Sequence, residues 1–197
     1  MARDYPAIKP ISLETDIGYA QPTQVVLERV HIDSPAVDVM TDFTRVTAVI
    51  ILPGDTVDEA HRRMIQRGVR SLLVVDQDRK LHGIVTANDV LGEKPVKTAV
   101  QRGVLRSELQ VRDIMTPRAA LEVLDMRDVS TATIGRIVAT LKAAGRQHTL
   151  VVDQDAKGRQ RVRGVFSATQ IARQLGIAIT TDAVARTFAD IEASLGP

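Results

Sequence analysis

The sequence contains an internal duplication, and this feature constrains the fold more than any other. Four segments of the first half recur in the second half in the same order and with similar residue types. An insertion of four residues precedes the last of them. Two copies of one supersecondary unit are therefore expected. The pairs are 36–41 and 111–116, 56–68 and 133–145, 73–76 and 150–153, and 83–86 and 164–167.

Each copy contains the same order of predicted elements. Apolar residues at helical spacing form one stripe per copy, between a threonine and a glycine where the helix would begin and end. A short β-branched run follows, which is typical of a strand buried on both faces, and then a second strand and a second helix. The order strand, helix, strand, strand, helix predicts an α/β fold of mixed α+β type. The stripes are Val57, Ala60, Met64 and Ile65, and Ile134, Ile137 and Leu141; the flanking residues are Thr56 and Gly68, and Thr133 and Gly145.

The composition is that of a globular protein, and it excludes several functions. Hydrophobic residues make up 44% of the chain and charged residues 25%, with a formal net charge of +2. So small an excess of positive charge does not predict nucleic acid as a partner. Cysteine is absent from the sequence, which excludes disulfides and thiol chemistry. No apolar run reaches the length of a membrane span, so we expect a soluble, cytoplasmic protein that binds no membrane.

Three kinds of motif carry a resemblance to a known family. They are DVMT and DIMT at 38–41 and 113–116, GVRSLLVVD at 68–76, and GIVTAND at 83–89. In this order and in duplicate, they resemble a tandem pair of CBS domains, a Bateman module, over residues 36–176. The resemblance implies two repeats packed with pseudo-two-fold symmetry. We expect an extended arm at 1–35, repeats at 36–92 and 111–176, a linker with a short helix at 93–110, and a helix at 177–197.

The stretch Thr86-Ala-Asn-Asp89 is the strongest candidate for a ligand site. A strand that ends in a hydroxyl residue and runs into a helix presents N–H groups and the positive end of the helix dipole to an anion. A carboxylate three residues later can accept two hydrogen bonds from a ribose diol. The same layout also serves as an ordinary helix cap. In CBS domains the matching residues bind adenosine nucleotides, which implies that Asp89 holds the ribose and Thr86 lies near the phosphates.

The resemblance extends this first site to both repeats. In CBS pairs the nucleotide lies in the cleft between the repeats, and a basic residue before the first buried strand often points at the phosphates. Arg70 matches that position, although a solvated surface arginine explains it equally well. The residues implied for the first site are Thr86, Asp89, Arg70, Ile84, Thr116, Arg118, Ala119 and Ala120.

The second repeat departs from this pattern at one position. Ser167 keeps the hydroxyl group, but Gln170 stands where the carboxylate is expected. A neutral amide lacks the charge-assisted hydrogen bonds of a carboxylate, so the second site is expected to be weak or empty. The residues implied for it are Thr41, Phe43, Val46, His148, Ser167 and Gln170.

Other candidate groups have plain explanations. Four basic residues within 157–163 belong to the insertion, which we interpret as a solvated hairpin tip, with a partner or nucleic-acid contact as the alternative. His61 and Asp58 are too few to hold a metal ion, so no metal site is expected. A helix stripe near the C-terminus covers the protein's own core or contributes to a dimer. Its residues are Val184, Phe188, Ile191 and Leu195.

We therefore expect a regulatory sensor module and not an enzyme. No nucleophile, base and orienting group occur together, and no Walker or Rossmann glycine pattern is present. The resemblance implies AMP, ADP or ATP as ligand, S-adenosylmethionine as a further adenosine compound, and a homodimer; it leaves magnesium undecided. A separate effector protein is expected to read the bound state. The alternative is a structural or dimerisation module with a degenerate ligand site, for which Gln170 is the supporting observation.

Overall fold

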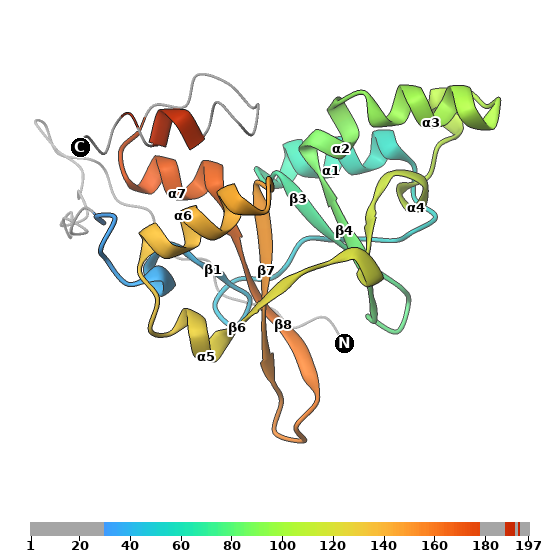
Figure 1. Ribbon diagram of the computed structural model, residues 1–197. Helices are drawn as coiled ribbons and strands as arrows, with labels where there is room; N and C mark the ends of the chain where they lie inside the picture. The colour runs from blue at the N-terminus through green and yellow to red at the C-terminus, as the bar shows by residue number, and fades with distance from the viewer. Residues whose placement is uncertain (1–29, 178–187, 192, 194–197) are drawn as a thin grey trace, which may run out of the picture.

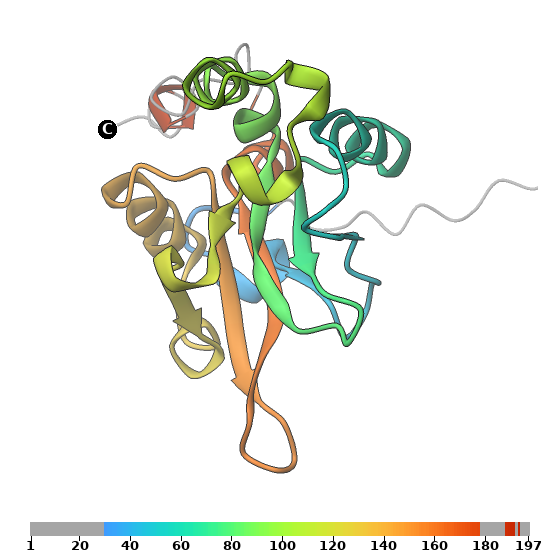
Figure 2. The ribbon, with the colours of Figure 1, turned by 90° about the vertical axis from the view of Figure 1, so that its right-hand side faces the viewer.

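A computed structural model of the chain describes residues 30–177, 188–191 and 193. Two four-stranded β-sheets lie beside each other with helices around them, and one long hairpin extends beyond the rest of the molecule (Figures 1 and 2). Residues 1–29 of the expected arm, together with Val184 and Leu195, lie outside the described residues.

The strands of the two sheets follow the same plan. They are β1 (Thr41–Asp42), β2 (Ile50–Ile51), β3 (Ser71–Val75), β4 (Leu81–Thr86), β5 (Thr116–Pro117), β6 (Val123–Asp125), β7 (His148–Gln154) and β8 (Gln160–Ser167). The first sheet has the order β2, β3, β4, β5, and the second has the order β1, β8, β7, β6. In each sheet a short strand runs parallel to the first strand of an antiparallel hairpin, β2 beside β3 and β6 beside β7.

The helices complete the predicted unit in both copies. A long helix precedes each hairpin and a shorter one follows it, so the order strand, helix, strand, strand, helix is confirmed, with one short helix added after β6. The short helix expected in the linker is also present, as α3. The helices are α1 (Val57–Arg67), α2 (Ala87–Leu91), α3 (Lys94–Arg102), α4 (Val111–Ile114), α5 (Met126–Val129), α6 (Ile134–Ala143) and α7 (Ala168–Gln174), with 3₁₀ helices at Ala36–Val39, Arg106–Glu108 and Arg118–Ala120.

The first long helix begins and ends as the sequence predicts. Thr56 Oγ1 accepts a hydrogen bond at 3.1 Å from a backbone N–H of the first turn, and Gly68 ends the helix in the left-handed conformation at a φ of 61°. In the second copy Thr133 occupies the N-cap position without a side-chain hydrogen bond, and Gly145 again has a positive φ. The prediction for Ile65 is wrong: it is 68% exposed, because it lies beside the face of α1 that packs on the sheet.

The segments that lead into the two repeats are exchanged between the sheets. We name residues 35–42 and 109–117 the lead segments. β1 lies in the first lead segment but pairs with β8 of the second repeat, and β5 lies in the second but pairs with β4 of the first. Each half of the molecule is therefore completed by the segment that leads into the other half.

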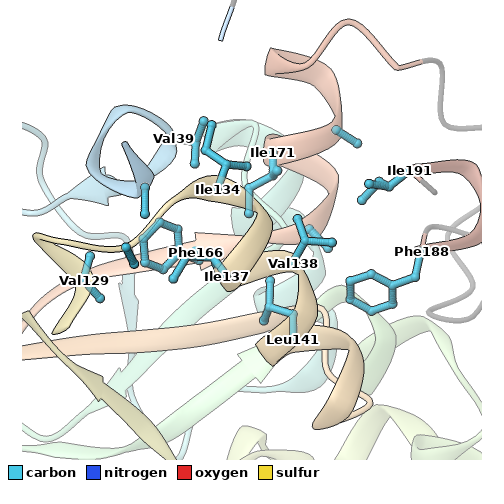
Figure 3. Packing of buried hydrophobic residues seen from close by; sticks show 14 of the residues in the cluster. Val39, Val129, Ile134, Ile137, Val138, Leu141, Phe166, Ile171, Phe188 and Ile191 are labelled. Carbon is cyan, nitrogen blue, oxygen red and sulfur yellow. The ribbon is translucent and has the colours of Figure 1, made fainter. Parts of the chain in front are cut away.

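The hydrophobic cores follow the same exchange. The core of the second half contains Ala36 and Val39 from the first lead segment, beside residues of α6, α7 and β8 such as Phe166 (Figure 3). The core of the first half contains residues of the second lead segment, which are Leu109, Val111 and Ile114. Neither repeat can bury its apolar face without the other, since each depends on side chains from the other's lead segment.

The C-terminal stripe belongs to the core of the second half. Phe188 and Ile191 are 3% and 0% exposed and pack in the same cluster as Val138, Leu141 and Ile171 (Figure 3). Of the two interpretations of this stripe, its described residues support the one in which it covers the protein's own core.

An apolar cluster and a charged pair join the two repeats. The cluster's buried members are Ile84, Leu150 and Val165. Beside it, Arg163 of β8 donates hydrogen bonds to both carboxylate oxygens of Asp42 on β1, each at 2.9 Å, and to Asp153 of β7 at 3.2 Å. The hydrogen bonds from Arg163 hold the pKa of Asp42 well below its usual range. The exchanged strand is thus held by charge as well as by backbone pairing.

Gly83 and Gly164 occupy equivalent places opposite the exchanged strands. A Cβ on Gly164 would lie 2.6 Å from the carbonyl oxygen of Thr41, and a Cβ on Gly83 would overlap the carbonyl oxygen of Thr116. We expect Gly83→Ala and Gly164→Ala each to lower the free energy of unfolding by about 1–3 kcal/mol, because the added methyl group pushes the exchanged strand away. Urea-unfolding curves measure this change.

Gly54 provides the matched control. A Cβ at Gly54 would meet nothing within 4 Å, so Gly54→Ala is expected to change the free energy of unfolding by no more than about 0.5 kcal/mol. Equal losses in Gly54→Ala and Gly83→Ala would contradict the explanation by close strand approach.

Candidate functional site

Among the cavities that residues of both repeats line, two lie at a helix start that follows a hairpin. The larger, which we name the Gln170 cleft, has a volume of about 460 Å³ and lies where β8 runs into α7. The smaller, the Asp89 cleft, has a volume of about 220 Å³ and lies where β4 runs into α2. Ile84, His148 and Leu150 line both clefts, so they form the wall between them.

The Gln170 cleft brings together all residues that the sequence predicts for the second site. The lead segment contributes to it because β1 pairs with β8 and passes beside the start of α7. Their role in binding a ligand remains a prediction. The residues are Thr41, Phe43, Val46, His148, Ser167 and Gln170.

Three arginines also line this cleft, and the sequence reasoning placed none of them there. Arg67 ends α1, Arg70 precedes β3, and Arg173 lies on α7. Among the described residues that line the cleft there is no Asp or Glu. Arg173 had a usable signal, because it follows Gln170 by three residues and so shares its helix face. Arg67 had no such signal, since it belongs to the helix end of the other repeat.

The assignment of Arg70 to the Asp89 site has to be corrected. The backbone carbonyl of Arg70 accepts a hydrogen bond at 2.8 Å from Ala87 at the helix start of its own repeat, but the residue lines the cleft at the opposite helix start. Arg70 therefore lies in the cleft of Ser167 and Gln170. The corresponding position in the Asp89 cleft is held by Gln147.

The Asp89 cleft contains four of the residues predicted for the first site. They are Thr86, Asp89, Ile84 and Thr116. Three further predicted residues do not line it, because directly after β5 the chain turns into an exposed 3₁₀ helix. Leu121 and Glu122 line the cleft in their place. The three displaced residues are Arg118, Ala119 and Ala120.

The Asp89 carboxylate accepts hydrogen bonds from residues at the start of its own helix and from Lys94. Its Oδ2 accepts hydrogen bonds from the Thr86 N–H at 2.9 Å and from the Thr86 hydroxyl at 2.7 Å, and its Oδ1 lies 3.1 Å from the Lys94 ammonium group. The Asp89 side chain is 15% exposed. These contacts form a capping box, so the helix-cap interpretation of this stretch is confirmed. A ribose diol would compete with them for the same oxygens.

His148 lies in the wall between the clefts. It opens β7 opposite Ser167, and the charges of Arg70 and Asp89 both act on its ring. Burial and the positive charge of Arg70 lower the pKa of His148 from 6.5 to about 4, and the negative charge of Asp89 opposes part of this change. The imidazole is therefore neutral at pH 7.

The basic residues of the hairpin at 157–163 are mostly neutralised. All three arginines of this segment form ion pairs with neighbouring carboxylates. Nucleic-acid binding depends on cations that pair with phosphates, so these ion pairs do not favour it. The interpretation as a solvated hairpin tip accounts for these contacts. The pairs are Arg159 with Asp155 at 2.8 Å, Arg161 with Asp153 at 2.7 Å and Arg163 with Asp42 at 2.9 Å.

In residues 30–177, 188–191 and 193, no three His, Asp or Glu side chains come together as metal ligands would. In the same residues, no helix has the length and apolar character needed to cross a membrane.

The fold and the sequence were compared with known proteins. Residues 31–95 match the family model of the CBS domain. An uncharacterized conserved protein from Pyrococcus horikoshii is similar in structure, with a TM-score of 0.54 and 20% identity over 77% of this chain and 99% of its own. A CBS-domain containing protein from Agrobacterium tumefaciens has a TM-score of 0.50 and 19% identity over 67% of this chain and 88% of its own. CBSX2, solved in complex with AMP, has a TM-score of 0.49 and 21% identity over 71% of this chain and 93% of its own.

No curated protein is similar enough in sequence to count as a relative. The family match and the shared fold nevertheless agree with the duplicated motifs. Residues 31–95 thus match a CBS domain, and the two repeats of the chain share one fold.

The neutral His148 makes stability depend on pH. Its pKa in the folded state, about 4, lies below the ordinary value of 6.5, so between these values the unfolded chain binds the extra proton. The neutral imidazole therefore contributes fully to the stability of the fold above pH 6.5, and this contribution is lost as the pH falls toward 4. We expect the free energy of unfolding to decrease in this range with a slope of up to about 1.4 kcal/mol per pH unit. Urea unfolding at pH 7.5, 6 and 5 measures it.

His148→Gln provides the comparison, because glutamine does not titrate. The variant is expected to show a flatter dependence of the free energy of unfolding on pH between 6.5 and 4. Identical slopes for the two proteins would show that His148 is not the responsible group.

Proposed function

We propose that this CBS-domain protein is a non-enzymatic regulatory module that binds AMP, ADP or ATP in the cleft between its repeats. The observation that carries the proposal is the charge of the Gln170 cleft. Arg67, Arg70 and Arg173 line it, and none of the described lining residues is acidic. Arginine binds phosphate oxygens through its planar fork of N–H donors, so a phosphorylated ligand matches these walls.

The other walls of the Gln170 cleft suit the remaining parts of a nucleotide. Its volume of about 460 Å³ lies within the roughly 300–1,000 Å³ of small-molecule sites. Phe43 and Val46 offer apolar surface for a base, and Phe43 offers a ring face for stacking. Ser167 and Gln170 offer a hydroxyl and an amide for the ribose hydroxyls.

The Asp89 cleft supports such a ligand less well, which reverses the ranking expected from the sequence. Asp89 and Glu122 bring two negative charges to its lining, against one positive charge from Arg146. Arg146 lies 3.4 Å from Glu122 and so faces a carboxylate already. Asp89 is in turn paired with Lys94, so this smaller cleft offers less positive charge to a phosphate than the Gln170 cleft does.

A ligand in this place has a route to regulation. The Gln170 cleft combines side chains of both repeats, so an occupant stabilises the arrangement of the repeats that it contacts best. An effector protein that distinguishes the two arrangements would then respond to the nucleotide. The resemblance to CBS pairs implies a separate effector protein and a homodimer. Light scattering at micromolar concentration tests whether the chain forms a dimer.

Thermal unfolding with added nucleotide tests the proposal. At 100 times the dissociation constant, a ligand raises the free energy of unfolding by about 2.7 kcal/mol. For a chain of this size we expect the melting temperature to rise by about 5–10 °C. S-adenosylmethionine lacks phosphates and is expected to give a smaller shift. No shift with AMP, ADP or ATP at millimolar concentration would favour the alternative of a structural or dimerisation module with a degenerate site.

Arginine variants locate the bound nucleotide. Arg70→Gln and Arg173→Gln are each expected to weaken ATP binding about tenfold or more in calorimetry, because each removes a charge-assisted hydrogen bond of roughly 1.5–3 kcal/mol. Arg112→Gln, an exposed arginine outside both clefts, is the matched control and is expected to bind as the wild type does. Asp89→Asn should retain binding. Loss of binding in Asp89→Asn with retention in Arg70→Gln would place the nucleotide in the Asp89 cleft instead.

A further inference from the structure

One break in the pseudo-two-fold symmetry of the molecule is a dipeptide at the start of each hairpin. Arg70 and Ser71 open the first hairpin and line the Gln170 cleft. Gln147 and His148 stand at the equivalent positions of the second hairpin and line the Asp89 cleft. The duplication thus supplied two clefts of the same design, and the two dipeptides make them different.

Gln147 ties one wall of the Asp89 cleft to the other. Its side chain is 5% exposed, and its amide oxygen accepts a hydrogen bond from Asn88 Nδ2 at 3.3 Å. Asn88 belongs to the start of α2, between Thr86 and Asp89, so this bond spans the two repeats across the mouth of the helix start. An arginine at this position could donate hydrogen bonds to a phosphate, whereas the glutamine forms a hydrogen bond between the two repeats.

His148 fills space that a serine would leave open. The imidazole stands where the first repeat has only the hydroxymethyl group of Ser71, and it lies among the residues of both clefts. The Asp89 cleft measures about 220 Å³, against about 460 Å³ for the Gln170 cleft, which Ser71 lines together with His148. The smaller volume lies below the roughly 300 Å³ at which small-molecule pockets begin.

We infer that Gln147 and His148 together close the Asp89 cleft to nucleotides, so that each chain binds one nucleotide, in the Gln170 cleft. This inference rests on the proposed function for the identity of the ligand, but the closure itself is a property of the Asp89 cleft. The start of the second hairpin also gives the Asp89 cleft a glutamine where the Gln170 cleft has Arg70, so this donor for a phosphate is missing.

Restoring the symmetry tests the closure. In the double variant Q147R/H148S the second hairpin opens with the same dipeptide as the first. Calorimetric titration with ATP at pH 7.5 is expected to give one site per chain for the wild type and two for Q147R/H148S. A folded double variant that still binds one ATP, or a wild type that binds two, overturns the inference.

The reciprocal change keeps the test valid if the double variant does not fold. Ser71→His places an imidazole at the start of the first hairpin and is expected to weaken ATP binding at least tenfold, since the ring fills the Gln170 cleft. Ser107→His, the same substitution at an exposed position outside both clefts, is the matched control. Unchanged affinity in Ser71→His overturns the inference.

The failure of the proposed function can be told apart from the failure of this inference. If the wild type binds no ATP, the proposed function fails. In that case a single site gained by Q147R/H148S still supports closure by the dipeptide, whereas no site in either protein overturns closure as well.

Discussion

The exchange of lead segments is the constraint on which the rest of the structure depends. β1 completes the sheet of the second repeat and β5 completes the sheet of the first. The carbonyl oxygens of Thr41 and Thr116 lie so close to Gly164 and Gly83 that no Cβ has room. Because both cores also contain side chains from the exchanged segments, burial of apolar surface in one repeat requires the other repeat to be in place.

This exchange also creates the clefts. Each lead segment must cross from its own repeat to the opposite sheet, and there it passes the helix start that follows the hairpin. The strand end, the helix start and the crossing segment enclose a space that neither repeat has alone. The buried wall of Ile84 and Leu150 holds the two spaces apart at the centre of the molecule. A ligand in either space therefore touches both repeats, which is the geometric requirement for reporting on their arrangement.

The sequence predicts local structure and its duplication well, and long-range pairing poorly. Thr56 and Gly68 have local chemistry that defines a helix start and end, so α1 follows from the chain itself. Nothing local in Thr41 or Thr116 indicates which sheet its strand joins, because a two-residue strand has no pattern of its own. For the same reason Arg70 was assigned to the cleft of its own repeat. A side chain at the start of a hairpin is placed by packing across the pseudo-symmetry axis, which periodicity and capping signals do not describe.

The residue at the helix start does not by itself set the charge of its cleft, and the physical reason is local. An acidic residue three positions after a strand end accepts hydrogen bonds from its own helix start, as Asp89 does from Thr86, and the nearby Lys94 ammonium group compensates its charge. At the start of α7, by contrast, the backbone N–H of Gln170 donates one long hydrogen bond, at 3.5 Å, to Ser167 Oγ. The Gln170 cleft thus has a neutral residue at its helix start and three arginines among its lining residues, whereas the Asp89 cleft has a carboxylate at its helix start. The charge that a phosphate would meet in such clefts therefore depends more on the side chains that the opposite repeat contributes than on the motif at the helix start.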